Sequence, residues 1–189
     1  MGSHFGNAGV FLVETLFGLY ITVLMLRILL QLVRANFFNP ICQFIVKVSN
    51  PVLAPMRRVL PNWRNLDVPA TVFMVILKCI ELTIILSIIG RQISVPAVVA
   101  VAVVSLLDFA ILTLLVVIFI KILISWIAPY SDSPINPLLY QLSAPLLEPA
   151  RRALPPISGL DLSPIIVLIG LQLSRFLLVG PLMDLARHL

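Results

Sequence analysis

Two pairs of adjacent arginines are the groups in this sequence best suited to binding chemistry. They occur in the segments PVLAPMRRVLP and PLLEPARRALP, in which prolines stand on both sides of each pair. A guanidinium group is planar and binds phosphate or carboxylate oxygens through two parallel hydrogen bonds. We therefore predict that the arginine pairs bind anionic lipid head groups or a protein partner. The four residues are Arg57, Arg58, Arg151 and Arg152.

A topological role is the alternative for these arginines. Cations beside an apolar segment keep that end of the segment in the cytoplasm. Near an anionic leaflet each also contributes about 1 kcal/mol of non-specific attraction. Orientation alone requires neither the flanking prolines nor the repeated spacing, and both interpretations stay open.

Charged side chains inside apolar runs form a second set of candidates. At the centre of a bilayer a charge costs at least about 2.5 kcal/mol and usually faces a bundle interior or a cavity. One interpretation is a polar path through the bundle. The other is that the acids lie at the outer membrane interface while the bases extend to the cytoplasmic one. The residues are Glu14, Arg27, Lys78, Glu81, Asp108, Lys121 and Arg175.

Local pairing and capping explain some of the charged residues without a binding role. Lys78 and Glu81 stand three positions apart, so they share one helix face and are expected to pair. Asp67 and Asp161 each precede an apolar run, where a carboxylate caps a helix N-terminus. Cation coordination is the alternative role for these two aspartates.

The composition identifies the class of protein that must position these groups. Of 189 residues, 60% are apolar and 11% are charged, against roughly 25% charged in soluble domains. The chain is therefore expected to be an all-α integral membrane protein with about four spans of roughly 20 residues. The net charge of +5 does not indicate nucleic acid, because most basic residues flank apolar runs.

Four apolar runs are the predicted spans, at about 10–33, 68–90, 107–128 and 162–182. The third run extends over 95–128 and is too long for one upright span, since it would make roughly 50 Å of helix. It must tilt, break or project beyond the bilayer, and we take Asp108 as the boundary or break.

The connectors at 40–62 and 134–156 are predicted to lie in the membrane interface. Ile41, Phe44, Ile45 and Val48 follow helical spacing and predict a short amphipathic helix, opened by Pro40 and stopping before Pro51. An apolar pattern at the same spacing follows Pro134. Such helices are too short to span a bilayer.

The two halves of the chain repeat one pattern at an offset of ninety-four positions. Ser49 corresponds to Ser143 and Asp67 to Asp161, with the prolines and arginines of each connector in register. We infer an internal repeat, 1–94 and 95–189. Each unit has two spans, so the units are parallel and both connectors lie on one side. The excess of basic residues beside the connectors predicts that they are cytoplasmic and that both termini are periplasmic.

The repeated pattern PxLxPxRRxLPxxxxLD, present in full in both halves, resembles the YggT family, also called YlmG. The resemblance covers essentially the whole chain in a two-repeat form. It implies a small multi-pass protein of the bacterial inner membrane or the plastid thylakoid. It also implies association with osmotic and cation tolerance, with cell or organelle division, or with assembly of a membrane cytochrome.

No motif in the sequence indicates an enzyme, a metal or another cofactor. Walker, GxSxG, HExxH and CxxC patterns are absent, and His4 and His188 stand in the tails. Our first expectation is a non-enzymatic inner-membrane protein that supports osmotic or cation homeostasis, with ion transport as one route. The alternative is a scaffold or assembly factor, for cell division or cytochrome maturation, acting through the arginine segments. The expected partners are the lipid bilayer, anionic head groups, and a membrane protein or a second copy of the chain, with no nucleic acid.

Overall fold

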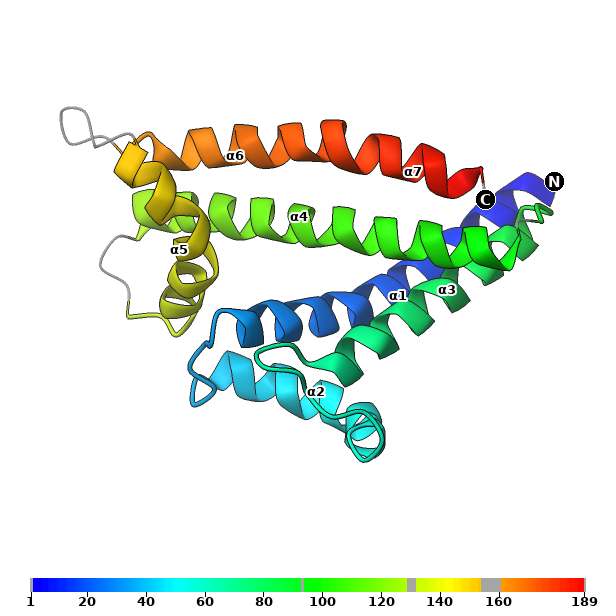
Figure 1. Cartoon of the computed structure of the whole chain (residues 1–189), viewed down its shortest axis with the longest axis horizontal. Helices are drawn as coiled ribbons and strands as arrows, with labels where there is room; N and C mark the ends of the chain where they lie inside the picture. The colour runs from blue at the N-terminus through cyan, green and yellow to red at the C-terminus, as the bar shows by residue number, and fades with distance from the viewer. Residues whose placement is uncertain (1, 93, 129–131, 154–160, 189) are drawn as a thin grey trace.

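Helices make up almost all of the computed structural model, which describes residues 2–92, 94–128, 132–153 and 161–188 (Figure 1). The elements in chain order are α1 (Gly2–Leu32), α2 (Pro40–Met56), α3 (Val68–Ile88), α4 (Val95–Ile127), α5 (Ile135–Ala153), α6 (Ser163–Ser174), the π-helical turn η1 (Arg175–Val179) and α7 (Gly180–Arg187).

Four segments are long and apolar enough to cross a membrane, as the composition predicts. They are His4–Leu32, Val68–Ile88, Val95–Ile127 and Ser163–Arg187. Figure 1 shows α2 and α5 at one end of these long helices and both chain termini at the other. We call the first of these the connector end. α1 packs along α3, and α4 packs along α6 and α7.

The predicted break at Asp108 is wrong, because α4 continues through it as one helix of 33 residues. Ser94 begins the helix by accepting a hydrogen bond from the backbone N–H of Ala97, at 3.3 Å. Asp108 has a partner on the neighbouring span, described below, so the helix need not end for the carboxylate to be satisfied. At roughly 1.5 Å per residue, α4 is about 50 Å long and exceeds the ~30 Å core of a bilayer.

The predicted end of the first amphipathic helix before Pro51 is also wrong. α2 includes Pro51 and Pro55, and α5 includes Pro145 and Pro149. Each pair of prolines is four positions apart and therefore lies on one face, and all four are exposed. Each proline removes one backbone hydrogen bond, but the loss falls on the outward side. The second arginine pair consequently lies inside α5, while the first follows the end of α2.

The fourth span is longer than predicted and contains a π-helical turn. It runs to Arg187 rather than to 182, through α6, η1 and α7. The turn comes immediately before Pro181, which has no N–H to offer to a regular helix. π-Turns of this kind arise where an α-helix accommodates an extra residue, and here the turn begins at the charged Arg175.

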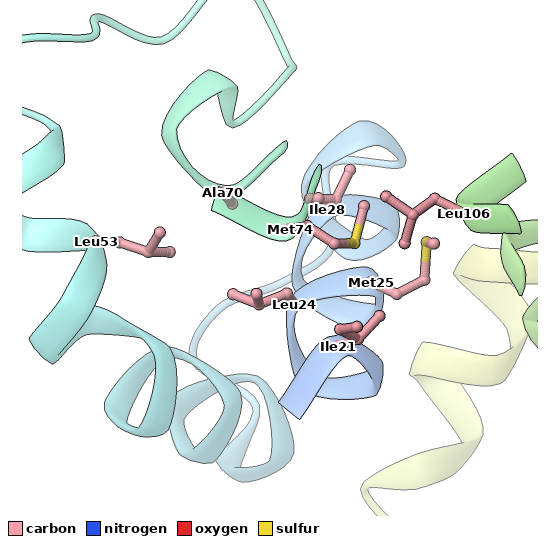
Figure 2. Packing of buried hydrophobic residues seen from close by; sticks show 8 residues of the cluster. All are labelled: Ile21, Leu24, Met25, Ile28, Leu53, Ala70, Met74 and Leu106. Carbon is pink, nitrogen blue, oxygen red and sulfur yellow. The ribbon is translucent and has the colours of Figure 1, made fainter. Parts of the chain in front are cut away.

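Two clusters of buried apolar side chains hold the connectors against the spans. In Figure 2, Leu53 of α2 points toward Leu24 of α1, and Ala70 and Met74 of α3 complete the cluster with Leu106 of α4. A second cluster joins both connectors, with Cys42 from α2 and Leu138 from α5. The connectors are therefore packed against the spans by one buried face each.

Candidate functional site

Asp67 lies at the N-terminus of α3 and is fully buried. Its Oδ2 accepts hydrogen bonds from Arg27 Nε at 3.0 Å and from Arg57 Nη2 at 2.8 Å. Its Oδ1 accepts from the backbone N–H of Ala70 at 3.2 Å, so the same carboxylate caps the helix. One buried side chain therefore joins α1, the arginine segment and α3.

Arg27 extends this network into α2. Its Nη1 donates to the hydroxyl of Ser49 and to Asn50 Oδ1, the latter at 3.1 Å. The Arg27 side chain is only 4% exposed, and a buried guanidinium requires such partners to offset the loss of hydration. We call Arg27, Ser49, Asn50, Arg57 and Asp67 the first polar cluster.

A second polar cluster occupies the equivalent place in the second half, and consists of Lys121, Ser143, Arg151 and Asp161. Lys121 Nζ donates to Ser143 Oγ at 2.8 Å and lies 4.9 Å from the centre of the Tyr140 ring. Arg151 binds Asp161, with Nη2 at 2.7 Å and Nε at 2.8 Å from Oδ2.

The two clusters differ in one connection. Arg27 is bound directly to Asp67, but within the described residues no ion pair joins Lys121 to Asp161. Each cluster contains two cations and one carboxylate, so each carries one net positive charge. In the first cluster Arg27 and Asp67 are buried and Arg57 is 35% exposed, whereas in the second both Arg151 and Asp161 are partly exposed, at 39% and 32%.

Asp161 lies outside the span that begins at Ser163, and its pKa lies below the ordinary value. Partial burial by itself raises the pKa, but hydrogen bonds from Ser163 and from Arg151, together with the charge of Arg151, outweigh that effect. One of these bonds is the 3.0 Å contact from the Ser163 N–H to Oδ1.

Each predicted arginine pair is divided by the structure. Arg57 and Arg151 bind the aspartates, whereas Arg58 and Arg152 are exposed and their side chains form no hydrogen bond or ion pair with a described residue. The four arginines are therefore not equivalent. One of each pair joins the connector to the aspartate before the following span, and the other is exposed.

The charges within the spans are mostly paired. Arg175 binds Asp108 through two hydrogen bonds, and Lys78 binds Glu81 at 2.8 Å within α3. Glu14 is exposed and has no partner among the described residues. No contact in the described part of the chain joins Glu14, Arg27, Asp108 and Lys121 into the continuous polar path that the sequence allowed.

A small cavity of about 250 Å³ lies between α1, α3, α4 and α7, lined in part by Lys78 and Asp108. Glu81, which is 3% exposed, uses one carboxylate oxygen for Lys78, and its Oε2 has no partner among the described residues. Across those residues no group of three His, Cys, Asp or Glu side chains could hold a metal ion.

Sequence reasoning missed three residues of these networks. Ser49 and Ser143 were matched between the halves and Asn50 was placed on the polar face of the first amphipathic helix, but none of the three was given a role. Each serine directly follows the last apolar residue of its amphipathic pattern, and each is completely buried. A buried polar residue on an apolar face is the signal that could have identified them.

Four helical segments long and apolar enough to cross a membrane, with two polar clusters at the connector end, indicate a multi-pass helical membrane protein. The CCB3/YggT family model matches the chain twice, over residues 6–89 and 100–182. The chain therefore belongs to the CCB3/YggT family.

Relatives in several bacteria are similar over nearly the full chain. A Vibrio alginolyticus protein is 40% identical over 182 residues, which is 93% of this chain and 97% of the relative. A Pseudomonas aeruginosa protein is 33% identical over 93% of this chain and 90% of its own length. YggT of Escherichia coli K12 is 34% identical, covering 86% and 85%. No solved structure matches the chain.

Proposed function

We propose that the protein is a non-enzymatic membrane scaffold or assembly factor that binds a protein partner at its connector end. The observation that carries this proposal is the division of each arginine pair. Arg57 and Arg151 are held by buried or partly buried carboxylates, and Arg58 and Arg152 are exposed beside them. The bound arginine orients its segment, which leaves the exposed arginine in a defined position.

Apolar side chains around the exposed arginines support partner binding. Val59 is 80% exposed and Trp63 is 71% exposed, both within a few residues of Arg58. Exposed arginine and tryptophan side chains are enriched among the residues that dominate protein interfaces. Both segments stand at the same end of the molecule (Figure 1). The basic residues at this end favour a cytoplasmic location in a bacterial inner membrane, with both termini periplasmic.

In vivo photo-cross-linking tests the proposal. A photoreactive residue placed at Val59 or Ala153 should give a discrete cross-linked species, whereas placement at Ile89, at the opposite end, should not. Arg58→Ala/Arg152→Ala should weaken the species at least five-fold. Arg91→Ala/Arg187→Ala removes the same charge from the other end and should leave it unchanged. Equal cross-linking from all three sites would contradict the proposal.

Support for osmotic or cation homeostasis, including movement of ions through the bundle, is a second candidate function. The observation that favours it is the cavity of about 250 Å³ between four spans, with Lys78 and Asp108 in its lining. Both charges are already paired, so conduction would require the pairs to open. This requirement makes it the second candidate.

Flux measurements in proteoliposomes containing only this protein separate the two functions. A scaffold should give no potassium or sodium flux above that of protein-free vesicles. A transport role predicts flux that Asp108→Asn or Lys121→Gln abolishes, while Arg58→Ala/Arg152→Ala leaves it intact. Flux that fails only in the exposed-arginine variant would contradict both assignments.

A further inference from the structure

The two halves differ most at a cavity beside the second polar cluster. This cavity has a volume of about 450 Å³ and lies between α4, α5 and α6. Among the described residues, its polar lining consists of Lys121, Ser125, Arg151 and Asp161, and Trp126 also lines it. The other described residues of the lining are aliphatic. We call it the second-half cavity.

The corresponding positions of the first half are packed. Leu24 and Leu53, both fully buried, belong to the cluster in Figure 2, and their counterparts ninety-four positions later, Ile118 and Leu147, line the cavity. The same holds for two further pairs, Ile28 with Ile122 and Ala70 with Pro164. Ile118 and Leu147 are as buried as their counterparts, at 0% and 1% exposed, so the cavity lies beside them and does not replace their packing.

Two changes in the sequence account for the opening. Arg27 is replaced by Lys121, and Asn50 is replaced by Ala144. The guanidinium of Arg27 reaches Asp67 and Asn50 together, but the single ammonium of Lys121 reaches Ser143. Alanine has no side-chain oxygen to offer. Among the described residues Lys121 therefore makes no direct bond to Asp161, whereas Arg27 is bonded to Asp67.

The basic side chains that line the cavity are suited to an anionic ligand. Lys121 and Arg151 contribute two positive charges to the lining and Asp161 one negative charge, and the carboxylate of Glu148, exposed on α5, also acts on Lys121. Arg151 uses Nε and Nη2 on Asp161, and its remaining N–H groups have no acceptor among the described residues. An ammonium and a guanidinium at one site suit the oxygens of a phosphate.

The position of the cavity selects a lipid. It lies at the connector ends of the two spans α4 and α6, where apolar helix meets the interface. Trp126 is 78% exposed, and tryptophan is enriched at the level of lipid head groups. Aliphatic walls next to a phosphate-binding group match a molecule that carries both an anionic head and acyl chains.

We infer that the second-half cavity binds the phosphate of one anionic phospholipid, with its acyl chains along α4 and α6. The inference does not rest on the proposed scaffold role.

Lipid binding to the purified full-length chain, measured by native mass spectrometry in detergent, tests this inference. Phosphatidylglycerol should bind with one tight equivalent per chain, at least ten-fold tighter than phosphatidylcholine or phosphatidylethanolamine. Inorganic phosphate at millimolar concentration should not displace it. Lys121→Gln should weaken binding at least ten-fold, whereas Lys47→Gln, which removes an exposed cation from α2, should not.

Two variants distinguish a built cavity from a general attraction between charges. Lys121→Arg/Ala144→Asn keeps the charge and supplies the groups that close the first cluster, and Ile122→Phe fills the space without any change of charge. Both should lose at least ten-fold in phosphatidylglycerol affinity and keep their thermal stability in lipid-free micelles. Retained binding in both variants, equal affinity for phosphatidylcholine, or displacement by inorganic phosphate would each overturn the inference.

Discussion

Arg175 and Asp108 face each other across two spans and form a two-pronged ion pair. Nε lies 2.6 Å from Oδ1 and Nη2 lies 2.9 Å from Oδ2, although the residues are 67 positions apart in the chain. Arg175 is the first residue of the π-helical turn, and Asp108 is in the uninterrupted middle of α4. This pair joins the fourth span to the third within two apolar segments, and an unpaired charge inside a span is costly.

Removing one partner of this pair should destabilise the protein. Asp108→Asn leaves the Arg175 guanidinium without a counter-charge inside a span, and an unpaired charge there costs at least about 2.5 kcal/mol. We expect a corresponding fall in the free energy of unfolding, measured by denaturant titration in mixed micelles. Asp108→Asn/Arg175→Gln removes both charges and should recover most of the loss. An equal loss in the single and the double variant would argue against the pair.

Asp67, which caps α3, and Asp161, which stands one residue before the N-cap of α6, should differ in their contribution to stability. Asp67 is completely buried between two arginines, so Asp67→Asn should cost on the order of 3–5 kcal/mol. Asp161 and Arg151 are about a third exposed, and Asp161→Asn should cost about 1 kcal/mol or less. The measurement is the free energy of unfolding of both variants under identical conditions. Equal costs would show that burial does not separate the two clusters.

The free energy of unfolding should decrease at acidic pH because of Asp161. Its pKa in the folded protein lies below the ordinary value, so the folded state favours the ionised carboxylate. This contribution is fully present above the unfolded pKa of about 3.9 and is lost as the pH falls through the lower folded pKa. The wild-type chain should lose unfolding free energy below about pH 4, and Asp161→Asn should lose less over the same range. An identical acid profile in the two proteins would contradict this assignment.

The repeat made many of these positions predictable, because equivalent residues carry equivalent groups. Asp67 and Asp161 could be assigned to helix N-termini from their place before apolar runs, and Lys78 and Glu81 could be paired from their spacing alone. The family and the number of spans followed from the arginine segments and the composition. These features depend on local sequence, which the chain displays directly.

The contacts that escaped prediction depend on distant segments or on a difference between the halves. Glu81 and Arg175 are equivalent positions with opposite charge, so the repeat gave no model for the Arg175–Asp108 pair. The prolines suggested that the connector helices end early, but four-residue spacing keeps them on the exposed side. The cavity of the second half arises because lysine cannot reproduce the contacts of arginine, and such a loss becomes visible only in three dimensions.

Labelling of single cysteines should establish the orientation of the connector end. We expect cysteine at Arg58 or Arg152 to react with a membrane-impermeant maleimide only after the cells are opened. Cysteine at Arg91 or Arg187 should react in intact cells, once the reagent has passed the outer membrane. The background is low because native Cys42 is buried, and burial raises the pKa of its thiol and reduces the reactive thiolate. A Cys79→Ser background removes the other thiol. Labelling at Arg58 in intact cells would place the connectors outside, and the positive charges beside them would then have no role in fixing orientation.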